Sequence, residues 1–339
     1  MNTDELRLAL YGCGAIAQDH WRGIREAAAR TRVTAVIDAD PQRAAAMASV
    51  TGAQSFTSFD AALAGAEFDA IDIMLPHHLH EAAASHALAA DKHVLLEKPM
   101  STSLDSCARI LAAARTSGRV FMIAEQAQYW PDALAVRNLI RDGTLGEIIT
   151  ARAFFGSAAA PLQGPKPWRF FLDQMGGGIV IDGGAHWIRP LRMWMGEIVE
   201  VVAVTGRPMA DMEGESLARA LLRFESGTVA AFDALYGGAY LGSGEEFRIT
   251  GTRAEIIIER GPQGRVLIFD ERHPQGETLM QKNPGRSQAF GFELRDFECA
   301  VLDGKTPDAS AEYSLGELRT ALAITQSAAT GKWERVRRQ

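Results

Sequence analysis

A glycine-rich turn near the N-terminus most constrains what this chain can fold into. The apolar run Leu6–Tyr11 is followed at once by Gly-Cys-Gly-Ala-Ile-Ala at positions 12–17, and Gln18–Arg30 then has a helical pattern. This is the G-x-G-x-x-G/A pattern in the context that binds dinucleotides, after a strand and before a helix. Gly12 permits the tight turn, and Gly14 lets the backbone approach a pyrophosphate at the helix N-terminus. The pattern therefore predicts a dinucleotide site.

A carboxylate after the next strand indicates which dinucleotide is bound. Val33–Ile37 reads as a strand and ends in Asp38, at about the twenty-residue interval typical of the ribose-binding acid. A carboxylate there accepts hydrogen bonds from the ribose hydroxyls and repels a 2′-phosphate. We therefore favour NAD over NADP. The alternative is that Asp38 only caps the turn into Asp40-Pro41.

The same alternation of strand and helix continues through the first part of the chain. The further elements that we expect are helices at Pro41–Val50, His80–Asp91 and Leu104–Ser117, and strands at Ala70–Leu75, Val94–Glu97 and Val120–Ala124. Alternation of this kind is the signature of a doubly wound parallel sheet with helices on both faces. We expect an α/β dinucleotide-binding domain over residues 1–125.

The pattern changes after about residue 125, where strands follow one another with few helices between them. A bridging helix is expected at Gln128–Arg141. The strand candidates are Glu147–Gly156, Val199–Gly206, Leu217–Glu225, Thr228–Leu235, Glu246–Thr250 and Glu255–Glu259. Gly227 lies between two of them, as a hairpin turn requires. This predicts an α+β domain over 126–339 with a large, mostly antiparallel open sheet, whose free face favours a homodimer or homotetramer.

The last part of the chain is expected to contain a loop region followed by two helices. Gly261–Arg286 is rich in Gly, Pro, Gln and charge, so we expect a mobile loop region there. Gln288–Leu302 and Ser314–Thr330 have amphipathic helical patterns and close the chain.

Composition excludes several classes of function. The 339 residues are 47% hydrophobic and 23% charged, with a net charge of −7 and dispersed basic residues. A nucleic-acid groove or an anionic membrane surface is therefore not expected, and no apolar run is long enough to span a bilayer. The acidic start Met1–Glu5 does not resemble a signal peptide. The three cysteines are far apart in the sequence, which fits reduced thiols in the cytoplasm.

The stretch Val94-Leu95-Leu96-Glu97-Lys98-Pro99 places two ionisable groups where ligands bind. Its apolar residues read as a buried parallel strand. Ligands of open α/β sheets lie beyond the carboxyl ends of the strands, which is where Glu97 and Lys98 fall. Pro99 restricts the backbone of Lys98 and so holds the direction of the amine. Alone, Glu-Lys-Pro is also a common surface tripeptide.

A second group of candidate residues follows three consecutive glycines at 176–178. If the chain is helical from Ile179, Asp182 and His186 lie one turn apart on one face. An imidazole can accept a proton from an alcohol near neutral pH, and Asp182 would bind a substrate hydroxyl or tune the histidine. Five glycines within nine residues are costly in a packed helix and suggest a non-structural reason. The alternative is a buried Asp–His pair that holds the helix in place.

Histidines 77, 78 and 80 follow Pro76 in a polar turn after a strand. A metal site is not expected, because no cysteine or acidic residue stands at a ligand spacing. The turn is better suited to line the cofactor site, and His80 is placed to cap the following helix.

Together these motifs resemble the glucose–fructose oxidoreductase, inositol dehydrogenase and rhizopine-catabolism family, written Gfo/Idh/MocA, over nearly the whole chain. The matching motifs are the turn at 12–17, the proline turn at 76–80, Glu97-Lys98-Pro99, Trp168-Arg169 and the glycine-rich run with Asp182 and His186. The resemblance implies a Rossmann domain followed by an α+β domain whose sheet makes oligomer contacts.

The resemblance also implies roles for particular residues. Lys98, Asp182 and His186 would be the catalytic residues and would also contact the substrate. The cofactor would be held by Gly12, Gly14, Ala15, Ile16, Asp38, Pro76, His77, His80, Glu97, Lys98, Gln126, Trp168 and Arg169.

Two positions depart from the family pattern. Many members have an acidic residue three positions after the histidine, and here that position is Arg189. A guanidinium cannot accept a hydrogen bond and favours carboxylate or phosphate. Arg189 is thus a candidate substrate-binding residue for an acidic sugar, unless it points outward and pairs with a neighbour. The asparagine usual in the proline turn is replaced by His77.

We therefore expect an NAD-dependent dehydrogenase that oxidises a hydroxyl of a sugar, sugar acid or cyclitol-like substrate. Three alternatives remain open. They are an NAD-requiring glycosidase that recycles its cofactor, an NADPH-dependent keto-sugar reductase, and a non-catalytic sugar-sensing regulator.

Overall fold

The computed structural model describes the chain except for residues 1–3, 159–165, 239–240, 243, 283–284 and 338–339. The expectation for the start of the chain therefore falls largely outside the described residues. The chain divides into two compact units, one of Met1–Gln126 with Ser287–Leu315 and one of Ala127–Arg286 with Gly316–Gln339. Each unit has its own sheet.

The described residues of the first unit form a six-stranded sheet in the order β3-β2-β1-β4-β5-β6, with every neighbouring pair parallel. Its strands are β1 Leu6–Tyr11, β2 Thr31–Ile37, β3 Gln54–Phe56, β4 Ala70–Ile73, β5 His93–Glu97 and β6 Phe121–Ala124. This confirms the doubly wound parallel sheet. The short strand β3 was not expected from the sequence.

Burial explains why these segments are strands. Val94, Leu95 and Leu96 of β5 are all fully buried, as a strand covered on both faces requires. The same holds for the middle of β1, where Leu8 and Leu10 are fully buried. We call this sheet the parallel sheet.

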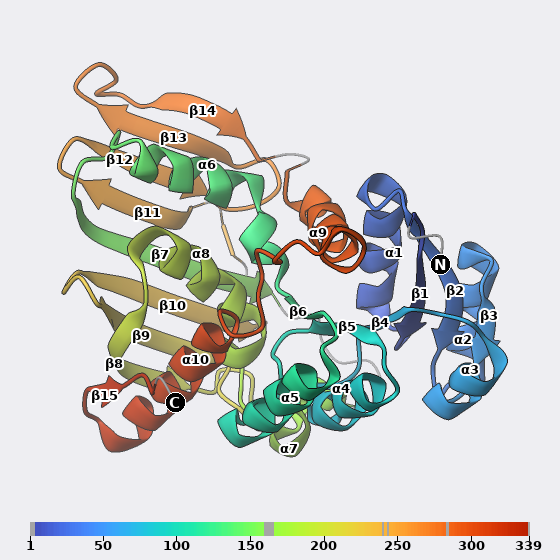
Figure 1. Cartoon of the computed structure of the whole chain (residues 1–339). Coiled ribbons are helices and arrows are strands. Elements are labelled where there is room, and N and C mark those ends of the chain that lie inside the picture. Colours follow the sequence, from blue (N-terminus) through green and yellow to red (C-terminus); the bar gives the residue numbers. More distant parts are fainter. Residues whose placement is uncertain (1–3, 159–165, 239–240, 243, 283–284, 338–339) are drawn as a thin grey trace. The chain divides into compact units, whose positions relative to one another are not determined.

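Helices cover the parallel sheet within the first unit. They are α1 Ala15–Ala27, α2 Pro41–Thr51, α3 Phe59–Gly65, α4 His80–Ala89, α5 Leu104–Ser117 and α9 Ala289–Asp303. Asp40 caps α2 by accepting from the N–H groups of Gln42 and Arg43, and Gly52 ends it in the left-handed conformation. Helix α4 contacts α5, and α9 contacts α1 (Figure 1).

Helix α9 returns to the first unit from the far end of the sequence, although residues 126–339 were expected to form one domain. Two glycines permit its close approach to α1. A Cβ on Gly23 would lie 2.8 Å from the carbonyl carbon of Phe290, and a Cβ on Gly291 would lie 2.9 Å from the Cβ of Ala27. The helical pattern over Gln288–Leu302 was correct, but a pattern does not reveal which sheet a helix covers.

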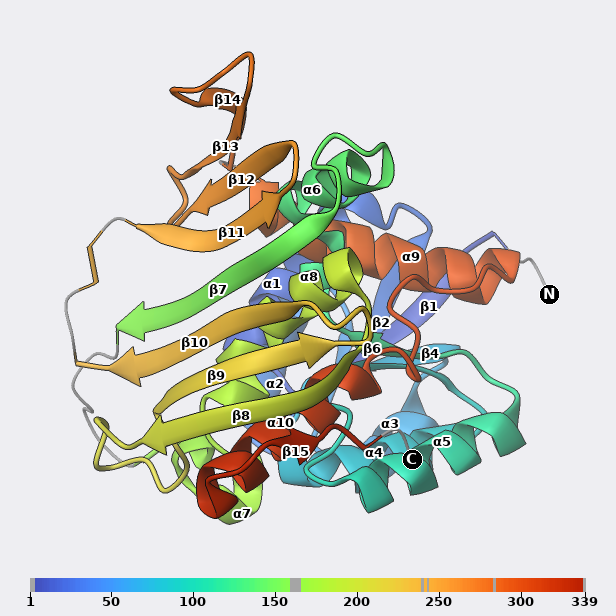
Figure 2. The same ribbon diagram turned by 90° about the vertical axis from the view of Figure 1, so that its left-hand side faces the viewer.

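In the second unit the described residues form a nine-stranded sheet in the order β14-β13-β12-β11-β7-β10-β9-β8-β15 (Figure 2). Its strands are β7 Ile148–Ala158, β8 Ile198–Gly206, β9 Leu217–Phe224, β10 Val229–Gly237, β11 Glu245–Gly251, β12 Ala254–Glu259, β13 Arg265–Asp270, β14 Glu277–Gln281 and β15 Glu334–Arg335. Strands β7 and β10 run parallel, and the other described neighbours run antiparallel. The predicted large, mostly antiparallel sheet is confirmed, and we call it the mixed sheet.

The expected loop at Gly261–Arg286 is wrong over Arg265–Asp270 and Glu277–Gln281, because β13 and β14 lie there. Val266 and Ile268 alternate with less buried neighbours and point into the core. Val266 also pairs with Ile258 of β12. The overall composition of the segment hid this short alternation. Residues 283–284 lie outside the described part.

The helices of the second unit are α6 Pro131–Arg141, α7 Leu172–Met175, α8 Ala185–Met195 and α10 Leu315–Thr330. Helix α8 packs on β7 and contacts α6, and Ser327 of α10 accepts a hydrogen bond from Ala203 N of β8 at 3.0 Å. Shorter turns are η1 His77–Leu79, η2 Gln126–Tyr129, η3 Trp168–Phe170, η4 Val180–Gly184 and η5 Gly285–Gln288. No helix in the described residues is long and apolar enough to cross a membrane.

The crossing of α1 and α9 can be tested at Gly23. Gly23→Ala should lower the free energy of unfolding by about 1–3 kcal/mol, because the added methyl group overpacks the contact. Urea denaturation measures the change. Gly242→Ala is the control, since no described atom lies within 4 Å of its Cβ position. Helix propensity alone predicts that Gly23→Ala is stabilising, and that result would contradict the close packing.

Candidate active site

The glycine-rich turn has the geometry that a dinucleotide requires. Gly12 has a φ of +97°, and a Cβ there would lie 2.5 Å from the carbonyl oxygen of Met74. Gly14 is the N-cap of α1 and, as a glycine, has no side chain that could cap the helix. No described atom lies within 4 Å of its Cβ position, so the backbone is open to a ligand. These features fit a pyrophosphate at the start of α1.

Asp38 is half-buried and binds the backbone on both sides of it. Its carboxylate accepts from Cys13 N at 2.8 Å and from Asp40 N at 2.9 Å. Asp38 therefore does cap the turn into Asp40-Pro41, as the alternative supposed. A carboxylate has about four acceptor positions, so two such bonds leave capacity for ribose hydroxyls. Burial, with the charge of Asp38, raises the pKa of the Cys13 thiol to about 11.

Glu97 ends β5 and holds the backbone of the next residue. Its Oε2 accepts from Lys98 N at 3.0 Å, and its Oε1 lies 3.1 Å from Nε2 of His20. Lys98 is half-buried, and the Lys98–Pro99 peptide bond is cis. Glu-Lys-Pro is thus part of an ordered carboxyl end of β5, not a loose surface tripeptide.

The proline turn forms η1 and is joined to the segment after β5. The ring of His80 lies 2.7 Å from the carbonyl oxygen of Pro99 and 2.8 Å from that of Leu75. The expectation that His80 caps α4 is wrong, because Leu79 is the N-cap and His80 is the first helical residue. His77 is buried and His78 is exposed.

The helix with Asp182 and His186 begins with a π-helical turn, Val180–Gly184, and continues as α8. Gly184 N donates to the carbonyl of Ile179 at 2.8 Å. The predicted helix is thus confirmed, but its first turn is wider than an α-helical turn. π-helical turns within helices frequently occur at functional sites. Asp182 and His186 are both half-buried.

The glycines of this segment have packing reasons, which corrects the expectation of a non-structural one. A Cβ on Gly178 would lie 2.1 Å from the carbonyl oxygen of Glu215, and one on Gly183 would lie 2.4 Å from the ring of Phe155. Glu215 fixes the start of the π-helix, because its carbonyl accepts from Ile179 N at 2.7 Å and its side chain from Val180 N at 3.1 Å. Burial raises the pKa of Glu215.

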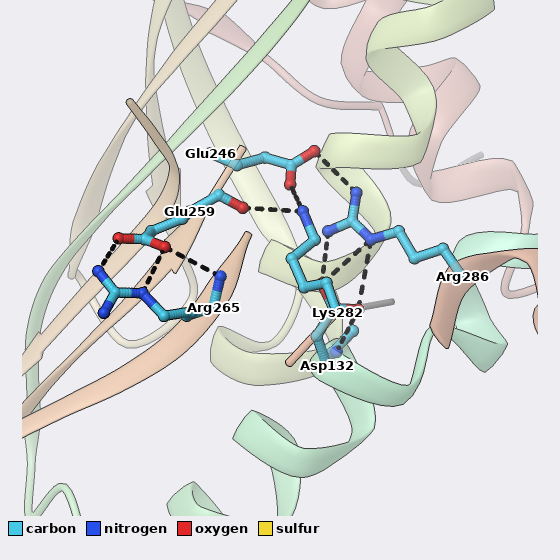
Figure 3. A network of polar contacts seen from close by, with 7 residues as sticks. Asp132, Glu246, Glu259, Arg265, Lys282 and Arg286 are labelled. Carbon is cyan, nitrogen blue, oxygen red and sulfur yellow. Dashed lines mark hydrogen bonds and ion pairs between the residues drawn. The ribbon is translucent and has the colours of Figure 1, made fainter. Parts of the chain in front are cut away.

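Aromatic and charged residues of the second unit pack around His186. The rings of His186 and Trp130 have centroids 6.3 Å apart, and the guanidinium of Arg286 lies 3.6 Å from the centroid of Trp130. Arg286 donates to Asp132 and to Glu246 at 2.7 Å each, and Lys282 donates to Glu246 (Figure 3). This network fixes Trp130, one of the ring neighbours of His186.

Trp168, Arg169 and Gln126 lie in short turns. Trp168 and Arg169 are in η3, where the Arg169 guanidinium lies 5.6 Å from the Trp168 ring centroid. Gln126 begins η2 directly after β6.

Arg189 lies inside the second unit. Its guanidinium is fully buried and donates to Glu317 at 2.9 Å and to Gln128 at 3.2 Å. Glu317 also accepts from Arg192. Arg189 thus pairs with a neighbour, but inward and not at the surface as the alternative supposed. A guanidinium so engaged is poorly suited to a substrate, and we leave Arg189 out of the proposed substrate contacts.

The first unit therefore brings together the glycine turn, Asp38, the proline turn and Glu97-Lys98, and the second unit holds Asp182 and His186. Sequence reasoning missed His20 and Asp72, which are fully buried and bonded to each other at 2.7 Å. A signal was present. Asp72 is a charged residue inside the apolar run Ala70–Leu75, and charges in such strands are nearly always paired.

Comparison with protein families identifies the class of protein. Residues 6–125 match the profile described as "Oxidoreductase family, NAD-binding Rossmann fold", and residues 133–257 match the GFO/IDH/MocA C-terminal domain. The chain belongs to the Gfo/Idh/MocA family. It is an oxidoreductase with an NAD-binding Rossmann fold.

Individual relatives cover nearly the whole chain. The 1,5-anhydro-D-fructose reductase of Ensifer adhaerens is 28% identical over 334 residues, which is 96% of this chain and 97% of the relative. The dTDP-3,4-didehydro-2,6-dideoxy-alpha-D-glucose 3-reductase of Actinomadura kijaniata is 29% identical with the same coverage. A levoglucosan dehydrogenase, solved in complex with NADH, has a TM-score of 0.88 and is 22% identical, with coverage of 98% of this chain and 99% of that chain.

The structural role of Arg189 can be tested through its partner. Glu317→Gln should lower the free energy of unfolding by about 3–5 kcal/mol, because it removes the carboxylate charge that the buried Arg189 and Arg192 share. Chemical denaturation measures the loss, and NAD binding by the folded fraction should be unchanged. Glu81→Gln removes a partly exposed partner of Arg109 and should have a far smaller effect. If Glu317→Gln lowers the free energy of unfolding no more than Glu81→Gln does, the structural role of Arg189 is contradicted and Arg189 is again a candidate substrate contact.

Proposed function

We propose that the protein is an NAD-dependent dehydrogenase that oxidises a hydroxyl group of a sugar, sugar acid or cyclitol-like substrate. The observation that carries the proposal is the ordered Glu97-Lys98 segment at the carboxyl end of β5, the position at which open α/β sheets bind ligands. The half-buried Asp182 and His186 of the second unit supply the remaining groups.

The cofactor would be held by residues of the first unit and of the short turns. Gly12 and Gly14, with the N–H groups of Ala15 and Ile16, would bind the pyrophosphate. Asp38 would accept from the adenosine ribose hydroxyls, which favours NAD over NADP. The remaining proposed contacts are Pro76, His77, His80, Glu97, Lys98, Gln126, Trp168 and Arg169.

The catalytic step divides among three side chains. His186 would take the proton of the substrate hydroxyl as a general base. Lys98 would stabilise the negative charge that develops on that oxygen, since a fixed positive charge acts strongly in a site with little water. Asp182 would orient the substrate or the imidazole. The nicotinamide, when bound, supplies the hydride acceptor.

The choice of a carbohydrate substrate is supported by the names of the relatives. Those described above are two sugar reductases and a sugar dehydrogenase, and a D-apiose dehydrogenase of Paraburkholderia graminis is 29% identical over 67% of this chain. With Arg189 paired inside the second unit, the argument for an acidic sugar is weaker than the sequence suggested.

The reverse reaction, reduction of a keto sugar, is the second candidate. Two of the relatives with 96% coverage of this chain are named reductases. The same side chains would serve, since His186 would then return the proton to the oxygen. The half-buried carboxylate of Asp38 argues against NADPH as the reductant.

We also propose that the protein forms a homo-oligomer through the mixed sheet. Val204 of β8 and Leu221 of the neighbouring strand β9 are exposed. Apolar side chains gathered on a sheet face favour association with another surface.

Removing a proposed catalytic group should abolish most of the activity. We expect Lys98→Met and His186→Ala each to lower kcat/KM for the sugar substrate by about 10²–10⁴-fold, the range of general acid–base contributions. NADH absorbance under steady-state conditions measures the change. Lys332→Met and His86→Ala, at exposed positions, are the controls. Near-normal kcat/KM in both active-site variants would exclude the assignment.

Cofactor choice should depend on Asp38. Asp38→Ser is expected to weaken NAD binding and to lower the preference for NAD over NADP, because the repulsion of a 2′-phosphate is lost. Titration of each cofactor against protein fluorescence measures both affinities. Asp40→Asn keeps the cap of α2 and should leave the preference unchanged. An unaltered NAD:NADP ratio in Asp38→Ser would show that Asp38 serves only the turn.

A further inference from the structure

A second group of ionisable side chains is buried in the first unit. Within the described residues it comprises His20 of α1, Asp72 of β4, Glu97 at the end of β5, Glu125 after β6 and Glu293 of α9. His20, Asp72 and Glu293 are fully buried, and Glu125 is 1% exposed. The proposed cofactor and substrate contacts use only Glu97. The other four have no assigned role.

Hydrogen bonds connect this group to the proposed catalytic lysine. Nδ1 of His20 lies 2.7 Å from Oδ2 of Asp72, and Nε2 lies 3.1 Å from Oε1 of Glu97. The other oxygen of Glu97 accepts from Lys98 N at 3.0 Å. A continuous chain therefore runs from the middle of β4, through the imidazole, to the backbone of Lys98.

The two carboxylates define the charge of the imidazole. Both ring nitrogens of His20 face carboxylate oxygens, so both carry a hydrogen when those oxygens accept. Burial opposes a charged ring, but the charge and hydrogen bond of Asp72, followed by those of Glu97, raise the pKa of His20 well above its usual value. His20 is therefore an imidazolium between two carboxylates.

Glu293 differs from Asp72 and Glu97 in its hydrogen bonding. Neither of its oxygens has a hydrogen-bond partner among the described residues. The ionisable groups that face it are His20 from α1, Asp72 from β4, Glu97 from β5 and Glu125 after β6. Burial raises the pKa of Glu293 well above its usual range, and the nearby carboxylates add to this effect while His20 opposes it. One imidazolium cannot neutralise a further carboxylate, so Glu293 is the neutral acid.

We propose that His20, Asp72 and Glu293 are positioning residues, which fix the Glu97 carboxylate in one orientation and thereby place Lys98. The functional part of this inference rests on the proposed dehydrogenase activity. Asp72 orients the imidazole, the imidazole holds the Glu97 side chain in place, and the uncharged Glu293 closes the group on the side of α9 without competing for the proton of His20. A glutamate without this support would be free to turn, and Lys98 N would lose its acceptor.

The charge state is tested first, without any assay of activity. A group whose pKa is raised in the folded state stabilises the fold below its unfolded pKa, and this stabilisation is lost as the pH rises through the folded pKa. Glu293→Gln removes the titration and keeps the shape of the neutral acid. Its melting temperature should be close to that of the unaltered protein at pH 5 and increasingly higher towards pH 9. One proton corresponds to about a tenfold change in the unfolding constant per pH unit.

The matched control for this test is Glu312→Gln, an exposed glutamate of the same unit. Its melting temperature should follow that of the unaltered protein at every pH. If Glu293→Gln behaves in the same way, or is destabilised most at high pH, Glu293 is ionised and the proposal fails. Nitrogen NMR of the labelled histidines, with His20→Gln to assign the signal, should show a doubly protonated His20 ring at pH 8. A neutral ring would also overturn the proposal.

The effect on Lys98 is tested by kinetics. In His20→Gln we expect kcat to fall by about 10²-fold, the cost of a small misplacement of a reacting group, while the dissociation constant for NAD changes much less. His86→Gln, an exposed histidine of the same unit, should keep both values. Normal kcat in folded His20→Gln would overturn the positioning role. If the unaltered protein oxidises no sugar, the proposed function fails, while the melting and NMR results still decide the charge state of the buried group.

Discussion

The first unit depends on one property of parallel strands, which is that their carboxyl ends meet at the same edge of the sheet. Strand β1 leads there into Gly12, β2 into Asp38 and β5 into Glu97 and Lys98. The backbone fits because Gly12 lies against the carbonyl of Met74, where a side chain has no room. The residues that we propose as cofactor contacts, although they come from segments far apart in the sequence, are thus gathered at one edge of the parallel sheet.

In the second unit, the corresponding constraint is the start of the helix that carries Asp182 and His186, the two side chains that we propose to be catalytic. The start of the π-helix is held by Glu215, whose carbonyl and side chain accept from Ile179 and Val180. This requires a close approach that Gly178 permits. The glycines therefore have a structural role, because the close packing that they permit fixes the turn from which Asp182 and His186 project.

Much of this could be predicted from the sequence, because regular strands and helices leave periodic patterns. The parallel sheet, most strands of the mixed sheet and the glycine turn were correct for that reason. Strands β13 and β14 were missed because a short alternation was masked by the surrounding composition. The partners of Arg189 and His20 could not be predicted, because Glu317 and Asp72 are 128 and 52 residues away and only the folded chain brings them together.

The return of α9 to the first unit has a consequence for biosynthesis. A chain emerging from the ribosome folds broadly from its N-terminal end, yet here the first unit lacks one of its helices until residues 289–303 have been made. Until then the α9-facing side of α1, with Gly23 and Ala27, has no cover from that helix. The nascent first unit must therefore persist in an incomplete form while strands β7 to β14 of the mixed sheet are synthesised.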